Sequence, residues 1–220
     1  MIKDIVAKIH PQMVLDVGCK HGAFTKKLAE YCGKITAIDI SCDAIDQARR
    51  ENISDNISYF CMNALDLRFP DEYFDLVYER ISLHHIKKWR DVIDEMVRVS
   101  QKYILIEEPL EDPRSQEKKN TIEAQKLYLE IQQEVGYAHY PYVDTDAMEN
   151  HLKGRGLKVE TRIYRTDELT TFDEFFEYYE SFVVKTERRS YWRDRLKALR
   201  NKFDGQELAI NDIFFAYAEK

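Results

Sequence analysis

The sequence has no uninterrupted apolar run long enough to cross a bilayer, which takes about 20 residues. Its first residues, MIKDIVAKIH, contain one early lysine but neither the apolar core nor the cleavage site of a signal peptide. We therefore expect a cytoplasmic protein without a membrane span.

Cysteine is scarce, and its spacing forms no C-x-x-C pair. The four cysteines all lie in the first third of the chain, at Cys19, Cys32, Cys42 and Cys61. Because they lie in or beside predicted strands and helix ends, we expect buried free thiols. The spacing does not favour structural zinc or thiol chemistry, and no metal centre is expected.

Positive charge is not in excess. The chain has 33 Lys and Arg against 40 Asp and Glu, a formal net charge of -7, which disfavours a surface built to bind nucleic acid. Internal repeats and low-complexity tracts are also absent from the sequence. With 220 residues, 44% of them hydrophobic, the chain is expected to form a single domain over residues 1–220.

Strand-like and helix-like patterns alternate up to Pro109. We expect helices near 23–31, 42–52 and 84–100, and strands at 13–17, 34–41, 57–64, 73–81 and 102–109. This alternation predicts an α/β fold, in which a parallel sheet has helices on both faces. Such a sheet binds its ligand at the carboxyl ends of its strands. The residues at that edge are Asp16 to Gly22, Asp39, Asn63, Ala64, Arg80 and Glu107 to Pro109.

After Pro109 the pattern changes, and two helical insertions are expected at about 111–143 and about 166–210. The first is expected to contain a polar helix over 111–136 and an aromatic turn, GYAHYPYVD, and the other is expected to be helical over 171–203. A helix from 145 and strands near 157–164 and 211–219 complete a seven-stranded, mostly parallel sheet. We expect the insertions to set substrate choice, with residues 111–143 as a mobile lid.

The turn after the first strand, DVGCKHG (16–22), lacks one glycine of the usual nucleotide-binding pattern. Gly18 and Gly22 allow backbone N–H groups and a helix start to approach a ligand. A dinucleotide site would need G-x-G-x-x-G, and Asp16 would repel a diphosphate but attract an ammonium group. A ligand with an amino-acid tail and a nucleoside head therefore fits better than NAD, and an NAD-dependent oxidoreductase is disfavoured.

These residues resemble the class I S-adenosylmethionine-dependent methyltransferases, in the small-molecule branch called methyltransferase type 11 or UbiE-like. VLDVGCKHG (14–22) is similar to that family's D-x-G-x-G-x-G motif, and AIDIS (37–41) is similar to its second strand with the terminal acid. CMNALDLRFPDEYFDLVYERISLHHI (61–86) resembles the stretch with D-A, F-D-x-V and L-H-H, and ILIEEP (104–109) resembles the fifth strand. The resemblance covers most of residues 13–109. It implies a Rossmann-like fold, the cofactor S-adenosyl-L-methionine and the product S-adenosyl-L-homocysteine.

The resemblance also implies roles for individual residues. Asp16 and the Gly18 backbone would bind the methionine amino group and tail, and Asp39 would accept both ribose hydroxyl protons. Ile40 would pack on the adenine face. The full set of cofactor-binding residues implied in this way is Asp16, Gly18, Lys20, Gly22, Asp39, Ile40, Asn63, Ala64 and the backbone around Arg80.

Two of these positions depart from the family pattern. Lys20 replaces the middle glycine, which costs roughly 1 kcal/mol if the position needs a positive φ. If it does not, the lysine points outward and could reach the cofactor carboxylate. Asn63 stands where aspartate is frequent, and its carbonyl oxygen can still accept a hydrogen bond from the adenine amino group.

Methyl transfer from a sulfonium is an in-line displacement, and it needs a general base only when the acceptor carries a proton of high pKa. The candidates for a catalytic role are Glu108, at the rim, and His139, in the aromatic turn; Glu107 is a further candidate. The candidate substrate-binding residues are His84, Tyr137, Tyr140 and Tyr142. For His84 and His85 we favour a helix-start pair with one ring packed inward.

Two further patterns have a simple structural interpretation. A stripe at helical spacing favours helix packing over a substrate wall, and consists of Phe172, Phe175, Phe176, Tyr179 and Phe182. The run KTERRSYWRDRLKALRNK (185–202) could bind RNA. An amphipathic helix with Trp192, Leu196 and Leu199 turned inward is the favoured interpretation.

The leading hypothesis is an enzyme, monomeric or homodimeric, that methylates a small-molecule acceptor. We favour an amine or another electron-rich acceptor. One alternative is a cofactor-binding protein without turnover, such as a partner subunit or sensor, which Lys20 and Asn63 would favour. Another is an RNA methyltransferase. Formation of S-adenosylhomocysteine by the purified protein would separate an enzyme from a binding protein.

Overall fold

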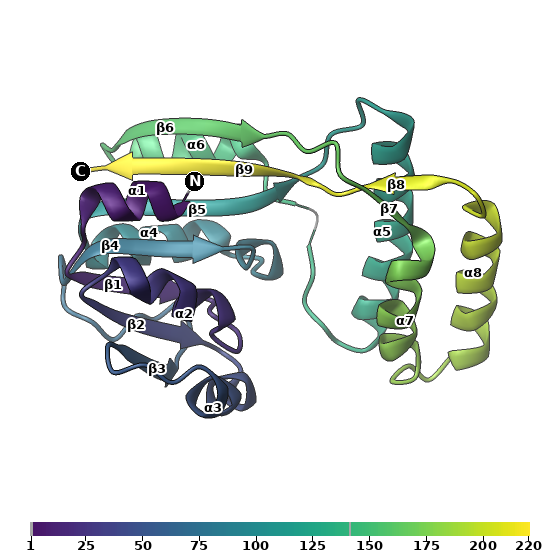
Figure 1. Cartoon of the computed structure of the whole chain (residues 1–220), viewed down its shortest axis with the longest axis horizontal. Coiled ribbons are helices and arrows are strands. Elements are labelled where there is room, and N and C mark those ends of the chain that lie inside the picture. The colour runs from purple at the N-terminus through teal and green to yellow at the C-terminus, as the bar shows by residue number, and fades with distance from the viewer. Residues whose placement is uncertain (1, 141) are drawn as a thin grey trace.

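The computed structural model describes residues 2–140 and 142–220. Within them, a seven-stranded sheet of order β3-β2-β1-β4-β5-β9-β6 forms one end of the molecule (Figure 1). Neighbouring strands among β1 to β5 pair in parallel, and β9 pairs antiparallel with both β5 and β6. The strands are β1 (Met13–Val17), β2 (Lys34–Asp39), β3 (Ile57–Cys61), β4 (Phe74–Arg80), β5 (Ser100–Leu110), β6 (Lys158–Tyr164) and β9 (Asp212–Glu219). The predicted seven-stranded, mostly parallel sheet is confirmed.

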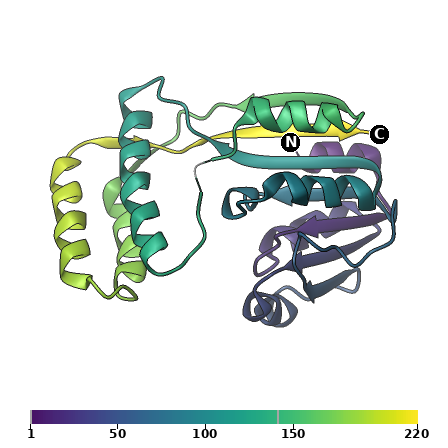
Figure 2. The same ribbon diagram turned by 180° about the vertical axis from the view of Figure 1, so that it is seen from behind.

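Helices cover both faces of this sheet, as predicted. Side chains alternate between the faces, so that Val14 and Leu76 enter one core while Leu15 and Val77 enter the other. The helices α4 (Trp89–Val99) and α6 (Thr145–Gly154) pack on the second face, in front in Figure 2. The first face carries α1 (Ile2–Ile9), α2 (Ala23–Leu28), which continues into η1 (Ala29–Tyr31), and α3 (Cys42–Glu51).

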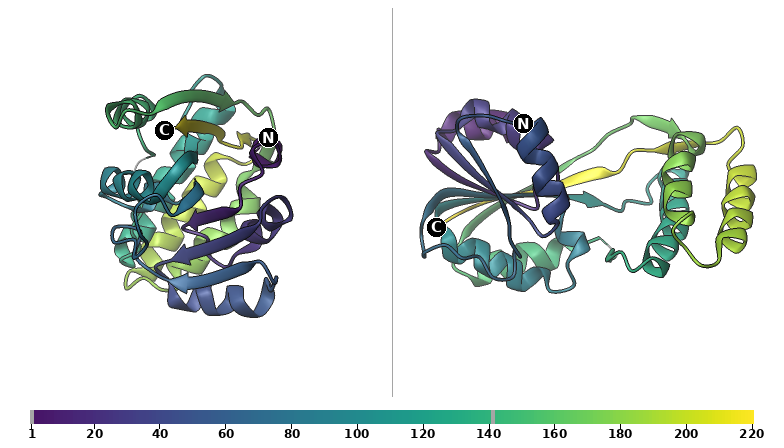
Figure 3. Two further views of the ribbon diagram at one scale, coloured as in Figure 1. Left: turned by 90° about the vertical axis from the view of Figure 1, so that its left-hand side faces the viewer. Right: turned by 90° about the horizontal axis from the view of Figure 1, so that it is seen from below.

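The two insertions form a second body, which we call the helical lobe. It consists of α5 (Gln116–Glu134), α7 (Phe172–Val183), α8 (Arg189–Lys202) and a small sheet of β7 (Leu169–Thr171) with β8 (Glu207–Ala209). The lobe has a hydrophobic core of its own, which includes Leu127, Tyr128, Trp192 and Leu196. Figure 3 (right) shows the lobe set apart from the sheet, with extended chain between them. The described parts of four passages, 111–115, 135–140 with 142–144, 165–168 and 210–211, make this connection.

A buried carboxylate holds the lobe where it meets the sheet. Asp212, the first residue of β9, is fully buried and accepts hydrogen bonds from Lys118 Nζ at 2.7 Å and from the Arg114 guanidinium. The Thr166 N–H donates to the same carboxylate at 3.1 Å, and Lys118 also donates to the Ile210 carbonyl at 2.5 Å. We call this group the Asp212 clamp, because it joins α5, the passage before β7 and the start of β9.

One local prediction was wrong in its bounds. The helix expected over 84–100 is a single 3-10 turn, η2 (Leu83–His85), followed by α4, which begins at Trp89. Residues 171–203 are helical as expected, in two helices, and the chain turns back after Val183 so that α7 and α8 can both pack against α5. The helix α1 and the short strands β7 and β8 were not predicted.

The prediction of four buried free thiols was wrong for two cysteines. Cys42 begins α3 and Cys61 ends β3, and the two form a disulfide with a Cα–Cα distance of 5.0 Å. Parallel pairing of β2 with β3 brings them together, since Asp39 and Cys61 are register partners. Cys19 and Cys32 are free and half-buried. Among the described residues, no helix is long and apolar enough to cross a membrane.

Candidate functional site

The turn after β1 has the backbone geometry of a ligand-binding loop. Gly18 and Gly22 have φ values of 78° and 77°. A Cβ on Gly18 would lie 2.4 Å from Ser82 Oγ, and one on Gly22 would lie 2.6 Å from the Tyr59 hydroxyl. Lys20 also has a positive φ, 51°, and its side chain is exposed. The structure therefore selects the first of the two alternatives for Lys20, in which the lysine carries backbone strain of roughly 1 kcal/mol.

Asp16 lies beneath this turn, at the end of β1. Its side chain is 3% exposed and accepts a hydrogen bond of 2.6 Å from the Thr25 hydroxyl. Burial raises the pKa of Asp16 to about 6, and the hydrogen bond from Thr25 opposes that rise. A carboxyl group in this state gains from a nearby cation, such as an ammonium group.

Asp39 ends β2 on the other side of the turn. Its two carboxylate oxygens accept backbone hydrogen bonds from Lys20 at 2.8 Å and from Ser41 at 2.9 Å. Each oxygen keeps a second lone pair, so the carboxylate can still accept two hydroxyl protons. These amide bonds fix the carboxylate at the strand end.

A hollow of about 200 Å³ lies next to Asp39, lined by Ile40, Cys61, Met62, Asn63, Asp66 and Arg68. Ile40 is 71% exposed, which is unusual for a residue that follows a buried strand. The Asn63 side-chain oxygen accepts the Leu65 N–H at 2.9 Å and retains a further lone pair. The predicted adenine-binding residues Ile40 and Asn63 are thus brought to one hollow.

The end of β4 forms the opposite side of the turn. Arg80 donates to Glu107 at 2.9 Å and its guanidinium lies 4.6 Å from the centre of the Phe24 ring. The next residue, Ile81, has a φ of 55°, which is strained for a β-branched side chain. Glu107 also accepts from the Tyr78 hydroxyl, so β4 supplies both of these donors.

Two buried carboxyl groups lie behind this edge. Glu108 is fully buried and accepts from the Leu83 N–H at 3.0 Å, and its other oxygen lies 2.8 Å from His84 Nδ1. Glu79 is equally buried and accepts from the Ser82 N–H at 2.6 Å. Burial, reinforced by Glu108, raises the pKa of Glu79 well above its usual value. Glu108 therefore lies behind His84 rather than at the surface of the rim, and its catalytic role stays a prediction.

Three imidazole rings meet beside this edge, and we call them the histidine triad: His84, His85 and His139. His84 is 4% exposed, as expected for one ring of the pair packed inward. The passage that follows α5 brings His139 to the pair, and the Tyr140 N–H fixes that passage by donating to the His84 carbonyl at 2.9 Å. Burial, followed by the neighbouring histidines, lowers the pKa of His139 to about 3, so its ring is neutral at pH 7.

A cavity of about 170 Å³ adjoins the triad on the lobe side. Its walls are largely aromatic and include Tyr128, His139, Tyr140, Tyr142 and, from α7, Phe175, Tyr178 and Tyr179. Glu111 and Gln125 add polar groups. Three sequence-predicted residues, His139, Tyr140 and Tyr142, thus line one cavity. Tyr137 is 48% exposed and packs edge-on against His85 instead.

The same cavity shows that the stripe serves two purposes. Phe172 and Tyr179 are buried in the lobe core, which confirms the interpretation as helix packing. Phe175 and Tyr179 also line the cavity, so part of the stripe is a wall as well. Sequence periodicity could not separate these uses, because it indicates a buried face but not what lies against it.

Residues 15–103 match the family model described as "Methyltransferase domain". The matched segment contains the glycine turn, Asp39, Asn63 and Arg80. Residues 15–103 of the chain are thus similar to a methyltransferase domain.

Two relatives are similar to part of the chain. Nodulation protein S from Rhizobium tropici is 38% identical over 73 residues, which are 33% of this chain and 30% of that protein. The probable tocopherol O-methyltransferase of Oryza sativa subsp. japonica is 32% identical over 43% of this chain and 27% of its own length. The matched segment therefore spans less than half of either protein.

Solved structures share the methyltransferase fold over nearly the whole chain. The YcgJ protein from Bacillus subtilis has a TM-score of 0.70 with 14% identity, covering 99% of this chain and 97% of its own. The N-methyltransferase NodS from Bradyrhizobium japonicum WM9, in complex with S-adenosyl-L-homocysteine, has a TM-score of 0.59 with 16% identity, covering 100% and 85%. Because these sequence identities are low, the structural similarity outside residues 15–103 shows a shared fold and nothing more.

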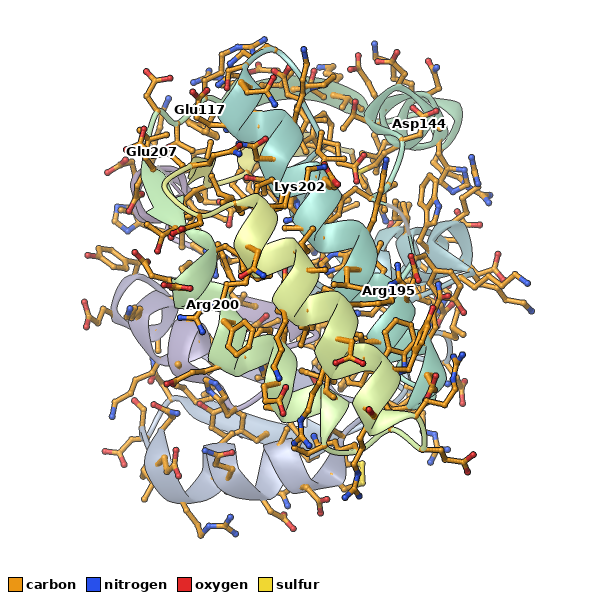
Figure 4. All side chains as sticks on the ribbon, turned by 90° about the vertical axis from the view of Figure 1, so that its right-hand side faces the viewer. Glu117, Asp144, Arg195, Arg200, Lys202 and Glu207 are labelled. Atoms are coloured by element: carbon orange, nitrogen blue, oxygen red, sulfur yellow. A yellow bond between two sulfur atoms is a disulfide. The ribbon has the colours of Figure 1, made fainter. Side chains whose placement is uncertain are left out.

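Most of the basic run over 185–202 lies on α8, on the outer side of the lobe. Trp192 and Leu196 are buried and Leu199 packs against the lobe core, which confirms the amphipathic interpretation. Figure 4 labels three of the cations on this helix, and each has an acidic partner: Arg195 with Glu130, Arg200 with Asp173 and Lys202 with Glu123. Their charge is largely neutralised within the lobe.

Proposed function

We propose that the protein transfers a methyl group from S-adenosyl-L-methionine to a small-molecule acceptor. The observation that carries the proposal is the convergence, at the carboxyl ends of β1 and β2, of a tight glycine turn, a fixed carboxylate and an adenine-sized hollow. Such an edge is where open α/β sheets bind ligands.

The residues at this edge fit the cofactor group by group. The two free lone pairs of Asp39 suit the ribose hydroxyls, and the exposed Ile40 side chain suits the adenine face. Asp16, buried under the turn, suits the amino group of the methionine tail. The cofactor supplies an electrophilic methyl group on a sulfonium, and the chain has to align the acceptor with it and exclude water.

The aromatic cavity beside the histidine triad is our candidate for the acceptor site. Its walls favour a flat or apolar molecule, and Glu111 offers a negative charge to an amine. His139 lines the cavity as a neutral ring, which can accept a hydrogen bond from an N–H or O–H group of the methyl acceptor. Glu108 would assist by orienting His84, which makes it a positioning residue.

The two alternatives from the sequence have less support. Pairing of the α8 cations with lobe carboxylates disfavours an RNA substrate, which needs free positive charge. A binding protein without turnover draws support from Lys20, since a strained lysine stands where the family has glycine. The backbone N–H of Lys20 nevertheless donates a hydrogen bond to Asp39. The strained conformation of Lys20 therefore also fixes the carboxylate of the proposed cofactor site.

Cofactor binding is tested by calorimetry with S-adenosylhomocysteine. Replacing Asp39→Ala removes two charge-assisted hydrogen bonds, roughly 1–3 kcal/mol in all, and should weaken binding about 5- to 150-fold. Asp55→Ala is the matched control, because Asp55 is exposed in the turn before β3. Unchanged affinity in Asp39→Ala would overturn the ribose assignment.

Turnover is tested by offering purified protein a panel of amines, phenols and carboxylates and measuring S-adenosylhomocysteine. Product formation that His139→Ala abolishes, while cofactor affinity stays constant, would support both the activity and the cavity. Cofactor binding without product for any acceptor would favour a binding protein.

A further inference from the structure

The three rings of the histidine triad lie close to one another. The three ring centres lie 4.2 Å (His84–His85), 4.6 Å (His85–His139) and 4.9 Å (His84–His139) apart. One ring nitrogen from each residue lies within 4.8 Å of those of the other two. The rings come from two places in the sequence, so the cluster exists only because the lobe passage returns to the rim.

Each ring has its Nδ1 atom engaged by an oxygen. His84 Nδ1 lies 2.8 Å from a Glu108 carboxylate oxygen, and His85 Nδ1 lies 2.8 Å from the Ala138 carbonyl. His139 Nδ1 lies 2.6 Å from the side-chain oxygen of Gln132, whose amide nitrogen donates to the Tyr128 hydroxyl. These oxygens can only accept, so each Nδ1 carries the hydrogen. In its neutral form, each ring therefore has the same tautomer, with the lone pair on Nε2.

We propose that the three Nε2 atoms bind a divalent transition-metal ion of the zinc class. Imidazole nitrogen is the ligand that such ions share, and a histidine ligand in proteins usually donates its other N–H to a carboxylate or a carbonyl. All three rings already have that second partner, one of them a buried carboxylate. Zn–N bonds of about 2.0–2.1 Å put tetrahedral ligand nitrogens about 3.4 Å apart. The ligand nitrogens, which lie within 4.8 Å of one another, would therefore have to move closer by up to about 1.4 Å.

Two consequences distinguish this site from a structural metal centre. Three protein ligands leave a coordination position open, as in catalytic zinc sites. His139 belongs both to the triad and to the lining of the aromatic cavity, so the ion would border that cavity. It would also join the lobe passage to the rim, through His139 on one side and His84 on the other.

This proposal departs from the expectation that the chain has no metal centre. That expectation considered the cysteine spacing, whereas His84 and His85 lie more than 50 residues before His139 and form no sequence motif with it. Metal binding does not rest on the proposed methyl transfer, because its ligands lie outside the residues assigned to the cofactor.

The test uses untagged full-length protein that has been stripped with a chelator and titrated with Zn²⁺ by calorimetry. We expect one ion per chain. Co²⁺ should bind at the same site and give the visible absorption bands of low-symmetry coordination by nitrogen ligands. His139→Ala and His85→Ala, both less buried than His84, should each weaken Zn²⁺ binding by about 100-fold or more.

His10→Ala is the matched control, since His10 is exposed at the end of α1 and its loss should leave the affinity unchanged. Glu108→Gln should weaken binding about 10- to 100-fold through His84. Absence of stoichiometric binding, or equal affinity in His85→Ala, His139→Ala and the control, would overturn the site. Calorimetry with S-adenosylhomocysteine on the same stripped samples keeps this outcome separate from that of the proposed function.

Discussion

Glu108 and His84 form a buried pair whose atoms are 2.8 Å apart, and neither side chain is more than 5% exposed. The second oxygen of Glu108 holds the Leu83 N–H. One carboxylate therefore fixes both the backbone of the turn η2 and the ring that follows it. Any function of the His84 ring therefore depends on Glu108, which fixes its orientation.

Replacing Glu108→Ala would leave two buried donors without partners. We expect it to lower the free energy of unfolding by about 2–6 kcal/mol, because each of these two buried donors loses its acceptor at a cost of about 1–3 kcal/mol. Glu108→Gln should cost less, since its side-chain oxygen can still accept from one of them. Urea denaturation of both variants measures the difference, and equal losses would contradict the assigned bonds.

The pKa of Asp16 predicts a pH-dependent stability. Its folded-state pKa, about 6, exceeds the usual value of 3.8, so the folded protein binds more protons than the unfolded chain between these pH values. Stability should therefore fall as the pH rises through this window, by roughly 3 kcal/mol from this group. Denaturation at pH 4 and at pH 7 measures the fall. Asp16→Asn should reduce it, and a variant with the same slope as the wild type would exclude Asp16 as its source.

Lys20 should be a site where glycine stabilises the protein. Because its φ is 51°, Lys20→Gly relieves strain and should raise the free energy of unfolding by up to about 1 kcal/mol. Lys26→Gly is the contrast, since Lys26 lies within α2 and the same change there should cost about 1 kcal/mol. Thermal melts of the two variants should shift in opposite directions.

The Asp212 clamp should be among the largest polar contributions to stability. Asp212→Ala leaves the buried ammonium of Lys118 without its carboxylate, which costs about 3–5 kcal/mol. Lys118→Met in the same chain should recover part of that loss. Burial alone would raise the pKa of Asp212, but hydrogen bonds from Arg114 and Lys118 lower it below the usual value. The contribution should therefore persist above about pH 4 and disappear in stronger acid.

A mobile lid over 111–143 stays a prediction. Because part of α5 is buried in the lobe core, we expect the motion in the passages on either side of α5. Amides of the passages 111–115 and 135–140 should exchange fast without cofactor and more slowly with S-adenosylhomocysteine. Amides near Leu127 and Ile131, which are buried in the lobe core, should be protected in both states. Slow exchange throughout, with and without ligand, would contradict a lid.

The sequence predicted the parts of the fold that follow from local hydrophobic periodicity and from the rule that parallel sheets bind ligands at the carboxyl ends of their strands. Asp16, Asp39 and Asn63 end or follow strands, and the rule that strand ends meet at one edge was enough to bring them together. His139 could not be assigned to His84 in that way, because a contact between residues so far apart in the chain depends on how the lobe packs. The Cys42–Cys61 disulfide was missed for a similar reason, since it depends on the register of β2 against β3.

The buried role of Glu79 was missed for a different reason. An acid inside a strand with the sequence FDLVYER gives no sign of which face it enters, and its neighbour Arg80 is exposed. Only the pairing of β4 with β5 puts it near Glu108. The same alternation sends Glu107 to the opposite face, where it meets Tyr78 and Arg80.

The four passages between sheet and lobe bear on how this protein could be re-engineered. The lobe is two segments of chain that fold as one body, so neither insertion carries a complete hydrophobic core by itself. A graft of the lobe onto another scaffold would need four junctions, two of which flank the register partners Leu110 and Asp212. Transplanting one insertion alone should yield an aggregation-prone chimera, whereas exchanging both together, with the clamp retained, is a practical route to new acceptor specificity.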